Sequence, residues 1–81
     1  MKNLEMINRL KRMDQLITLK STGTPKEFAK KIDLSVSRVY DILLDMKELG
    51  APVKYSRIKR TYFYQKRGKF TIDIEWNDQK N

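Results

Sequence analysis

The chain contains neither cysteine nor histidine among its 81 residues. Without cysteine it can form no disulfide and offers no thiolate to a metal ion, and a reducing compartment is the simplest environment for it. Without histidine it lacks the side chain that most often transfers protons near neutral pH. A glycine-rich phosphate-binding loop is also missing. We therefore expect a protein that is not an enzyme and that has no cofactor and no metal site.

Long apolar runs are absent as well. No stretch approaches the roughly 20 apolar residues that cross a bilayer. The N-terminus mixes charged with apolar residues, unlike a signal peptide. The sequence thus predicts a soluble cytoplasmic protein without a membrane partner. Its length predicts a single domain over residues 1–76, followed by a polar tail over residues 77–81.

Acidic residues are few relative to basic ones, and the net charge is +8. Such an excess favours polyanionic partners, such as nucleic acid or an anionic membrane surface. Between Gly50 and Ile72 the chain contains no acidic residue and seven cations: Lys54, Arg57, Lys59, Arg60, Lys66, Arg67 and Lys69. A solvated surface that keeps the protein soluble is the alternative explanation for this segment.

Apolar residues at helical spacing predict a first helix from about residue 4 to residue 20. Gly23 is expected to stop it, because glycine accepts the left-handed conformation at a helix C-terminus. A second helix has a strong start signal in Thr24, Pro25 and Glu27. Threonine is a good N-cap, proline suits the first helical position, and the glutamate completes a capping box.

A tight turn over residues 33–35 leads to a third helix over residues 36–49, for which Ser35 is the expected N-cap. Residues 53–55 and 61–64 are rich in β-forming side chains and predict two strands joined by a basic loop. The sequence therefore predicts helices first and a small hairpin after them.

A third strand is predicted from Phe70 to Trp76, where apolar and polar residues alternate. The fold class is then α+β, with three helices packed on a small antiparallel sheet of two or three strands. The turn between the second and third helices suggests a helix-turn-helix, and the basic hairpin suggests a wing. A homodimer remains open, because the edge of the last strand could pair with a second copy.

The chain resembles a known module in several of its segments: Thr24–Ala29, Leu34–Ser35, Val39–Tyr40, Leu43, Met46–Tyr55 and Thr61–Tyr64. These segments are similar to the winged helix-turn-helix at the N-terminus of bacterial DeoR-like and WYL-domain regulators, and to biotin-repressor N-terminal domains. The resemblance covers about residues 9–64. It implies double-stranded DNA binding, transcriptional control and a location at the bacterial nucleoid.

Two features depart from this resemblance. Such regulators usually carry an effector-sensing domain after the module, so a sensor or partner protein on another chain is left open. The exposed face of the third helix is often basic in that family. Here it offers Asp41, Asp45 and Glu48 beside Arg38 and Lys47.

The start of the third helix contains the candidates for reading DNA: Ser37, Arg38, Tyr40 and Asp41. A major groove admits one helix, whose N-terminal residues approach the base edges. Arg38 suits a bidentate contact to guanine, and Asp41 could accept from cytosine N4 although phosphates would repel it. Ordinary exposed helix residues are the alternative explanation for all four.

The expected wing contributes four further candidates: Lys54, Arg57, Lys59 and Arg60. Long cations at a hairpin tip reach a DNA backbone or a minor groove. If all four neutralise phosphates, the logarithm of affinity should fall with the logarithm of salt concentration at a slope of about −3.6. Protection of a sheet edge against aggregation is the alternative role.

Two other functions remain open from the sequence. The same fold could associate with a protein through Leu44, Phe63 and the acidic residues of the third helix. RNA binding is the other. The aromatic residues of the hairpin are expected in the core rather than on a base-stacking platform, with Phe63 as the exception because it alternates with Tyr62 and Tyr64.

Overall fold

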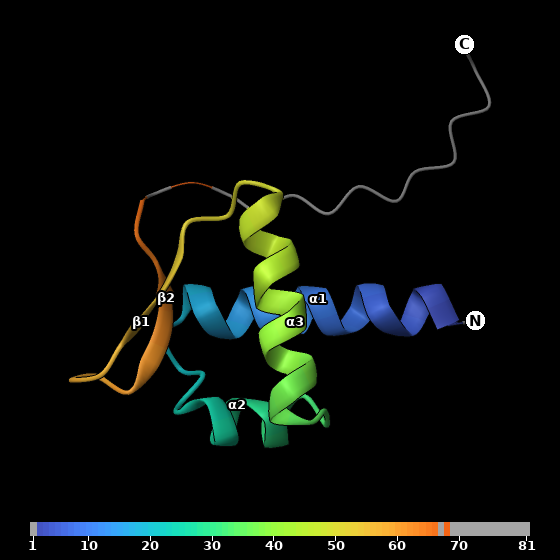
Figure 1. Cartoon of the computed structure of the whole chain (residues 1–81), viewed down its shortest axis with the longest axis horizontal. Helices are drawn as coiled ribbons and strands as arrows, with labels where there is room; N and C mark the ends of the chain where they lie inside the picture. The colour runs from blue at the N-terminus through green and yellow to red at the C-terminus, as the bar shows by residue number, and fades with distance from the viewer. Residues whose placement is uncertain (1, 67, 69–81) are drawn as a thin grey trace, which may run out of the picture.

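The computed structural model describes residues 2–66 and 68. Its elements are, in order, α1 (Lys2–Thr18), α2 (Pro25–Lys31), α3 (Val36–Glu48), β1 (Val53–Ser56) and β2 (Thr61–Tyr64). In Figure 1, α3 crosses α1, α2 lies beside the start of α3, and the hairpin lies beside the C-terminal end of α1. The α+β arrangement of three helices with a two-stranded antiparallel sheet agrees with the prediction. The predicted strand from Phe70 to Trp76 and the tail over residues 77–81 lie outside the described residues.

The first helix begins and ends two residues earlier than predicted. It ends in a Schellman motif, in which the Ser21 amide donates to the Leu16 carbonyl at 2.9 Å and the Lys20 amide donates to the Ile17 carbonyl at 3.0 Å. The left-handed residue of this motif is Lys20, with a φ of 54°. The prediction that Gly23 stops α1 is therefore wrong, because a lysine takes the conformation that glycine usually provides.

The start of α2 confirms the predicted capping box. The Glu27 amide donates to the Thr24 hydroxyl at 3.2 Å, and the Thr24 amide donates to Glu27 Oε1 at 2.8 Å. Pro25 occupies the first turn, as expected. Gly23 has a φ of 75°, and a Cβ added there would lie 2.6 Å from Glu27 Oε1. Glycine is thus required just before the box rather than as a stop for α1.

The third helix follows the tight turn as predicted, and ends one residue earlier. The Arg38 amide donates to Ser35 Oγ at 3.1 Å, which makes Ser35 the N-cap. A second Schellman motif ends the helix, with the Ala51 amide on the Met46 carbonyl at 3.0 Å and Gly50 at a φ of 101°. Local contacts therefore define both ends of α3, and the Ser35 cap fixes its first turn.

The core lies between the three helices and one face of the hairpin. Its fully enclosed apolar side chains are Met13, Ile17, Phe28, Val39 and Met46. The hairpin contributes Tyr62, whose ring lies 5.6 Å from Phe28 and 4.8 Å from Tyr55 between centroids. The register pairs Tyr55 with Tyr62 and Val53 with Tyr64, so these side chains share the face toward the helices. Most hairpin aromatics thus belong to the core, as predicted.

Two polar contacts hold β2 against the helical part. Thr22 and Thr61 are buried, and their hydroxyls share one hydrogen bond at 3.1 Å. The Tyr64 hydroxyl donates to Asp14 Oδ1 at 2.5 Å. Burial, and then this hydrogen bond and the negative charge of Asp14, raise the pKa of Tyr64 well above its usual value. These contacts fix the position of the hairpin relative to α1.

Candidate nucleic-acid interface

The first two turns of α3 expose the side chains that the sequence suggested for DNA contact. Ser37, Arg38, Tyr40 and Asp41 are all exposed, and we call them the α3 front. In the same two turns Val39 is buried and Val36 packs against the core, with Tyr40 at the border of that apolar side. The N-cap at Ser35 holds this end of the helix in place. The α3 front is thus free to meet a partner.

The α3 front lies next to the hairpin. Burial raises the pKa of Tyr62 to about 12, and the nearby phenols of Tyr40 and Tyr55 add to the effect. Tyr40 therefore lies close to a residue of β2, although 52% of it is exposed. In Figure 1 the hairpin lies beside α3, and α3 contacts β1. The two predicted parts of the site are thus neighbours.

The four predicted hairpin cations are exposed as well: Lys54, Arg57, Lys59 and Arg60. Three of them belong to the turn over residues 57–60, whose remaining member, Ile58, is 95% exposed. The Lys59 amide donates to Ser56 Oγ at 3.1 Å, and Arg60 has a left-handed φ of 54°. The turn is therefore an ordered structure that directs cations into solvent.

The fold adds cations that the sequence analysis did not place at the site. Lys20, at the end of α1, lines the same surface hollow as Lys59. The pKa of Glu27 is lowered by its hydrogen bonds to Thr24 and, to a smaller extent, by Lys31 and Arg60. Arg60 therefore lies near the start of α2. Lys20 and the hairpin cation Lys59 thus lie together, which no local pattern in the sequence could reveal.

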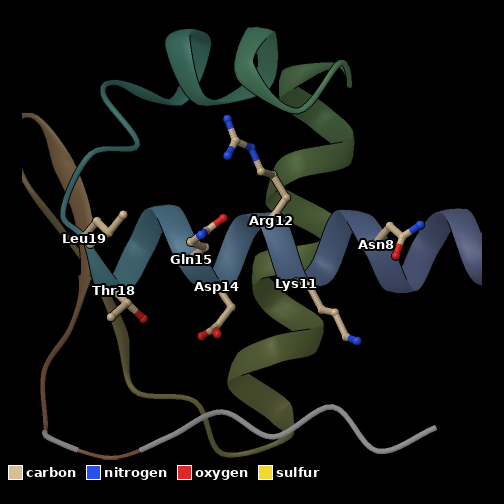
Figure 2. Close-up of a pocket in the computed structure, with 7 residues that line it drawn as sticks. All are labelled: Asn8, Lys11, Arg12, Asp14, Gln15, Thr18 and Leu19. Atoms are coloured by element: carbon tan, nitrogen blue, oxygen red, sulfur yellow. The ribbon is translucent and has the colours of Figure 1, made fainter.

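The outer face of α1 carries a shallow groove of mixed polarity, lined by Asn8, Lys11, Arg12, Asp14, Gln15, Thr18 and Leu19. Figure 2 shows Arg12 extending toward α2, whereas Lys11 and Asp14 extend to the other side of the helix. The polar groups of the groove thus diverge instead of converging on one ligand. Arg12 adds a further cation on the side of α2.

The remaining exposed face of α3 is acidic. Asp41, Asp45 and Glu48 follow one another at helical spacing, and we call them the acidic row. Leu44 lies among them and is 58% exposed. Negative charge of this kind repels a polyanion. The predicted DNA contact at Asp41 is therefore the least compatible with its surroundings, because it belongs to the acidic row as well as to the α3 front.

Residues 2–66 and 68 contain neither a membrane-spanning helix nor a cluster of metal-binding side chains. No helix there is long and apolar enough to cross a bilayer. No three acidic side chains gather there closely enough to hold a metal ion.

No protein-family model matches the chain, and neither the curated proteins nor the solved structures contain a match to it.

Proposed function

We propose that the protein binds double-stranded DNA as a sequence-specific bacterial transcriptional regulator of the winged helix-turn-helix type, acting at the nucleoid. The α3 front enters the major groove, and the hairpin is the wing that lies on the adjacent backbone. One observation carries this proposal. Tyr40 of the exposed α3 front lies close enough to Tyr62 of β2 to raise its pKa, and the four predicted cations of the same hairpin are all exposed.

Each part of the surface has a distinct role in this proposal. Arg38 makes a bidentate contact to guanine, which discriminates against other bases by about 1–3 kcal/mol. Ser37 and Tyr40 donate hydrogen bonds to phosphates or base edges, and the hairpin cations neutralise phosphates. The α3 front thus makes the base contacts, and the hairpin contributes most of the affinity through phosphate contacts.

The acidic row limits how α3 can approach DNA. Asp45 and Glu48 lie in the second half of the helix, where a helix lying flat along the groove would bring them near phosphates. Repulsion there favours entry by the first two turns only. The helix axis is therefore tilted out of the groove at its C-terminal end.

Selection of bound sequences from random duplexes tests this function. We expect a short consensus, and an affinity that falls steeply between 50 and 200 mM salt, on the order of 150-fold for four phosphate contacts. Arg38→Ala should relax the consensus at one position and cost about 1–3 kcal/mol there. Lys11→Ala, which removes an exposed cation from the outer face of α1, is the matched control. No duplex binding at 50 mM salt would refute the proposal.

Protein association is the second candidate function, and the exposed Leu44 within the acidic row favours it. A partner with a basic rim around an apolar residue would fit this face. If the protein does not bind duplex DNA at low salt, protein association becomes the favoured function. Leu44→Ser should then weaken the partner's binding, whereas Arg38→Ala should leave it unchanged.

A further inference from the structure

A small hollow lies between the end of α1 and the outer face of the hairpin. It is lined by Lys20, Ser56, Lys59, Thr61 and Phe63, and its volume is about 150 Å³. A cavity of about 150 Å³ accepts one benzene-sized ring in other proteins. The hollow therefore has room for one planar aromatic group.

Phe63 gives this hollow an aromatic wall. Its neighbours in β2, Tyr62 and Tyr64, face the core, so alternation turns Phe63 to the other face of the hairpin. It is half-buried and is not part of the core cluster. Packing of the core therefore does not explain an aromatic residue at this position. A ring that stacks on it would.

The rim of the hollow is positive and polar. Lys20 and Lys59 are exposed, and no acidic side chain lines the hollow. The hydroxyl of Ser56 accepts from the Lys59 amide at 3.1 Å, which holds that side of the turn. A group carrying negative charge is thus favoured at the rim.

The walls of the hollow are held in place before any ligand arrives. The backbone of Lys20 is fixed by the hydrogen bond of its amide to the Ile17 carbonyl at 3.0 Å. The Thr61 hydroxyl is buried and accepts from the Thr22 amide at 3.2 Å. The backbone of these walls therefore needs little ordering on binding.

We propose that this hollow binds a nucleotide, with its base stacked on Phe63 and its phosphate between the ammonium groups of Lys20 and Lys59. Base–aromatic stacking is tolerant of sequence, because every base has a π-face. An unpaired nucleotide at the end of a duplex and a free mononucleotide share this chemistry. The first source rests on the proposed DNA function and extends it to duplexes with a single-stranded end.

Titration with dAMP, monitored by amide chemical shifts of the ¹⁵N-labelled chain, tests the hollow by itself. We expect shifts at Ser56, Lys59 and Phe63, and weaker binding of adenosine and of inorganic phosphate. Phe63→Leu should weaken dAMP about tenfold, because leucine fills space without stacking, while phosphate binding stays unchanged. Equal binding of dAMP and phosphate, or an unaffected Phe63→Leu variant, would overturn the inference. Lys59→Gln alters only an exposed side chain and serves if Phe63→Leu does not fold. It should weaken dAMP binding, because it removes one of the two ammonium groups proposed to hold the phosphate.

A second comparison separates the two nucleotide sources. A blunt duplex and the same duplex with one unpaired nucleotide are compared for the wild type and for Phe63→Leu. A preference for the extended duplex that Phe63→Leu removes identifies the DNA source. Binding of dAMP without any duplex binding identifies the free nucleotide and refutes the proposed function alone. Binding of both duplexes equally, with no response to dAMP, refutes the hollow and leaves the proposed function standing.

Discussion

Thr22 is hydrogen-bonded to Thr61 across 39 residues of sequence. The Thr22 amide donates to Thr61 Oγ1 at 3.2 Å, and the amide of Tyr62 donates back to Thr22 Oγ1 at 2.8 Å. Both threonines are buried, so water cannot replace either hydrogen bond without disrupting the packing. Thr61 follows directly after the hairpin turn. This contact therefore fixes the base of the turn against the segment that joins α1 to α2.

Replacing Thr61 by valine should destabilise the fold. Thr61→Val keeps the shape but leaves the buried amide of Thr22 without an acceptor, which costs about 1–3 kcal/mol. The free energy of unfolding, measured by urea denaturation, checks this. Thr18→Val, at an exposed position of α1, is the control and should change stability by less than about 0.5 kcal/mol. Equal effects of the two variants would show that the buried contact adds nothing.

Stability should fall at alkaline pH. Burial raises the pKa of Tyr62 from 10.0 to about 12, and the pKa of Tyr64 is raised further by burial and by Asp14. Above pH 10 the unfolded chain loses these protons while the folded chain keeps them, so unfolding becomes more favourable as pH rises. Urea denaturation between pH 9 and pH 12 measures the decline.

Tyr64→Phe is the informative variant for this decline. It removes one of the two raised groups, so its stability should fall less steeply above pH 10 than that of the wild type. It also removes the donor to Asp14 and should lower stability near neutral pH. Parallel curves for the variant and the wild type above pH 10 would contradict the role assigned to Tyr64.

Each hairpin cation that contacts a phosphate should contribute to the salt dependence of duplex binding. Arg57→Gln and Lys54→Gln should each reduce the magnitude of the log–log slope by about 0.9. Fluorescence anisotropy of a labelled duplex at several salt concentrations gives the slope. Lys11→Gln, on the outer face of α1, should leave it unchanged. A slope that responds equally to all three substitutions would indicate a diffuse charge effect without a hairpin contact.

The acidic row should weaken non-specific DNA binding. Asp45→Asn and Glu48→Gln remove exposed negative charges beyond the α3 front, so each should strengthen binding by about 0.2–1 kcal/mol at low salt. The gain should shrink as salt rises, because the charges are screened. Competition against random duplex measures it. Weaker binding of both variants would show that the row contacts DNA through favourable interactions.

Local signals in the sequence predicted much of this fold. The capping box of α2, the N-cap at Ser35 and both strands follow from residues close together in the chain, and the structure confirms them. The end of α1 was predicted wrongly for the same reason. Glycine is the usual signal for a left-handed residue, but Lys20 takes that conformation three residues before Gly23.

The long-range contacts could not be predicted. Thr22 and Thr61 look like ordinary polar residues of loops and strands, and only the fold brings them together and buries them. Lys20 and Lys59 likewise come from distant segments before they line one hollow. The α3 front and the hairpin cations were predicted as exposed, but the closeness of Tyr40 to Tyr62 depends on how α3 packs beside the hairpin.

The left-handed backbone at Lys20 and Arg60 has a consequence for how this surface could change over time. For residues other than glycine that conformation costs about 1–2 kcal/mol, and glycine would relieve it. Relief would remove a positive charge in each case. Thermal stability and positive charge therefore oppose each other at these two positions.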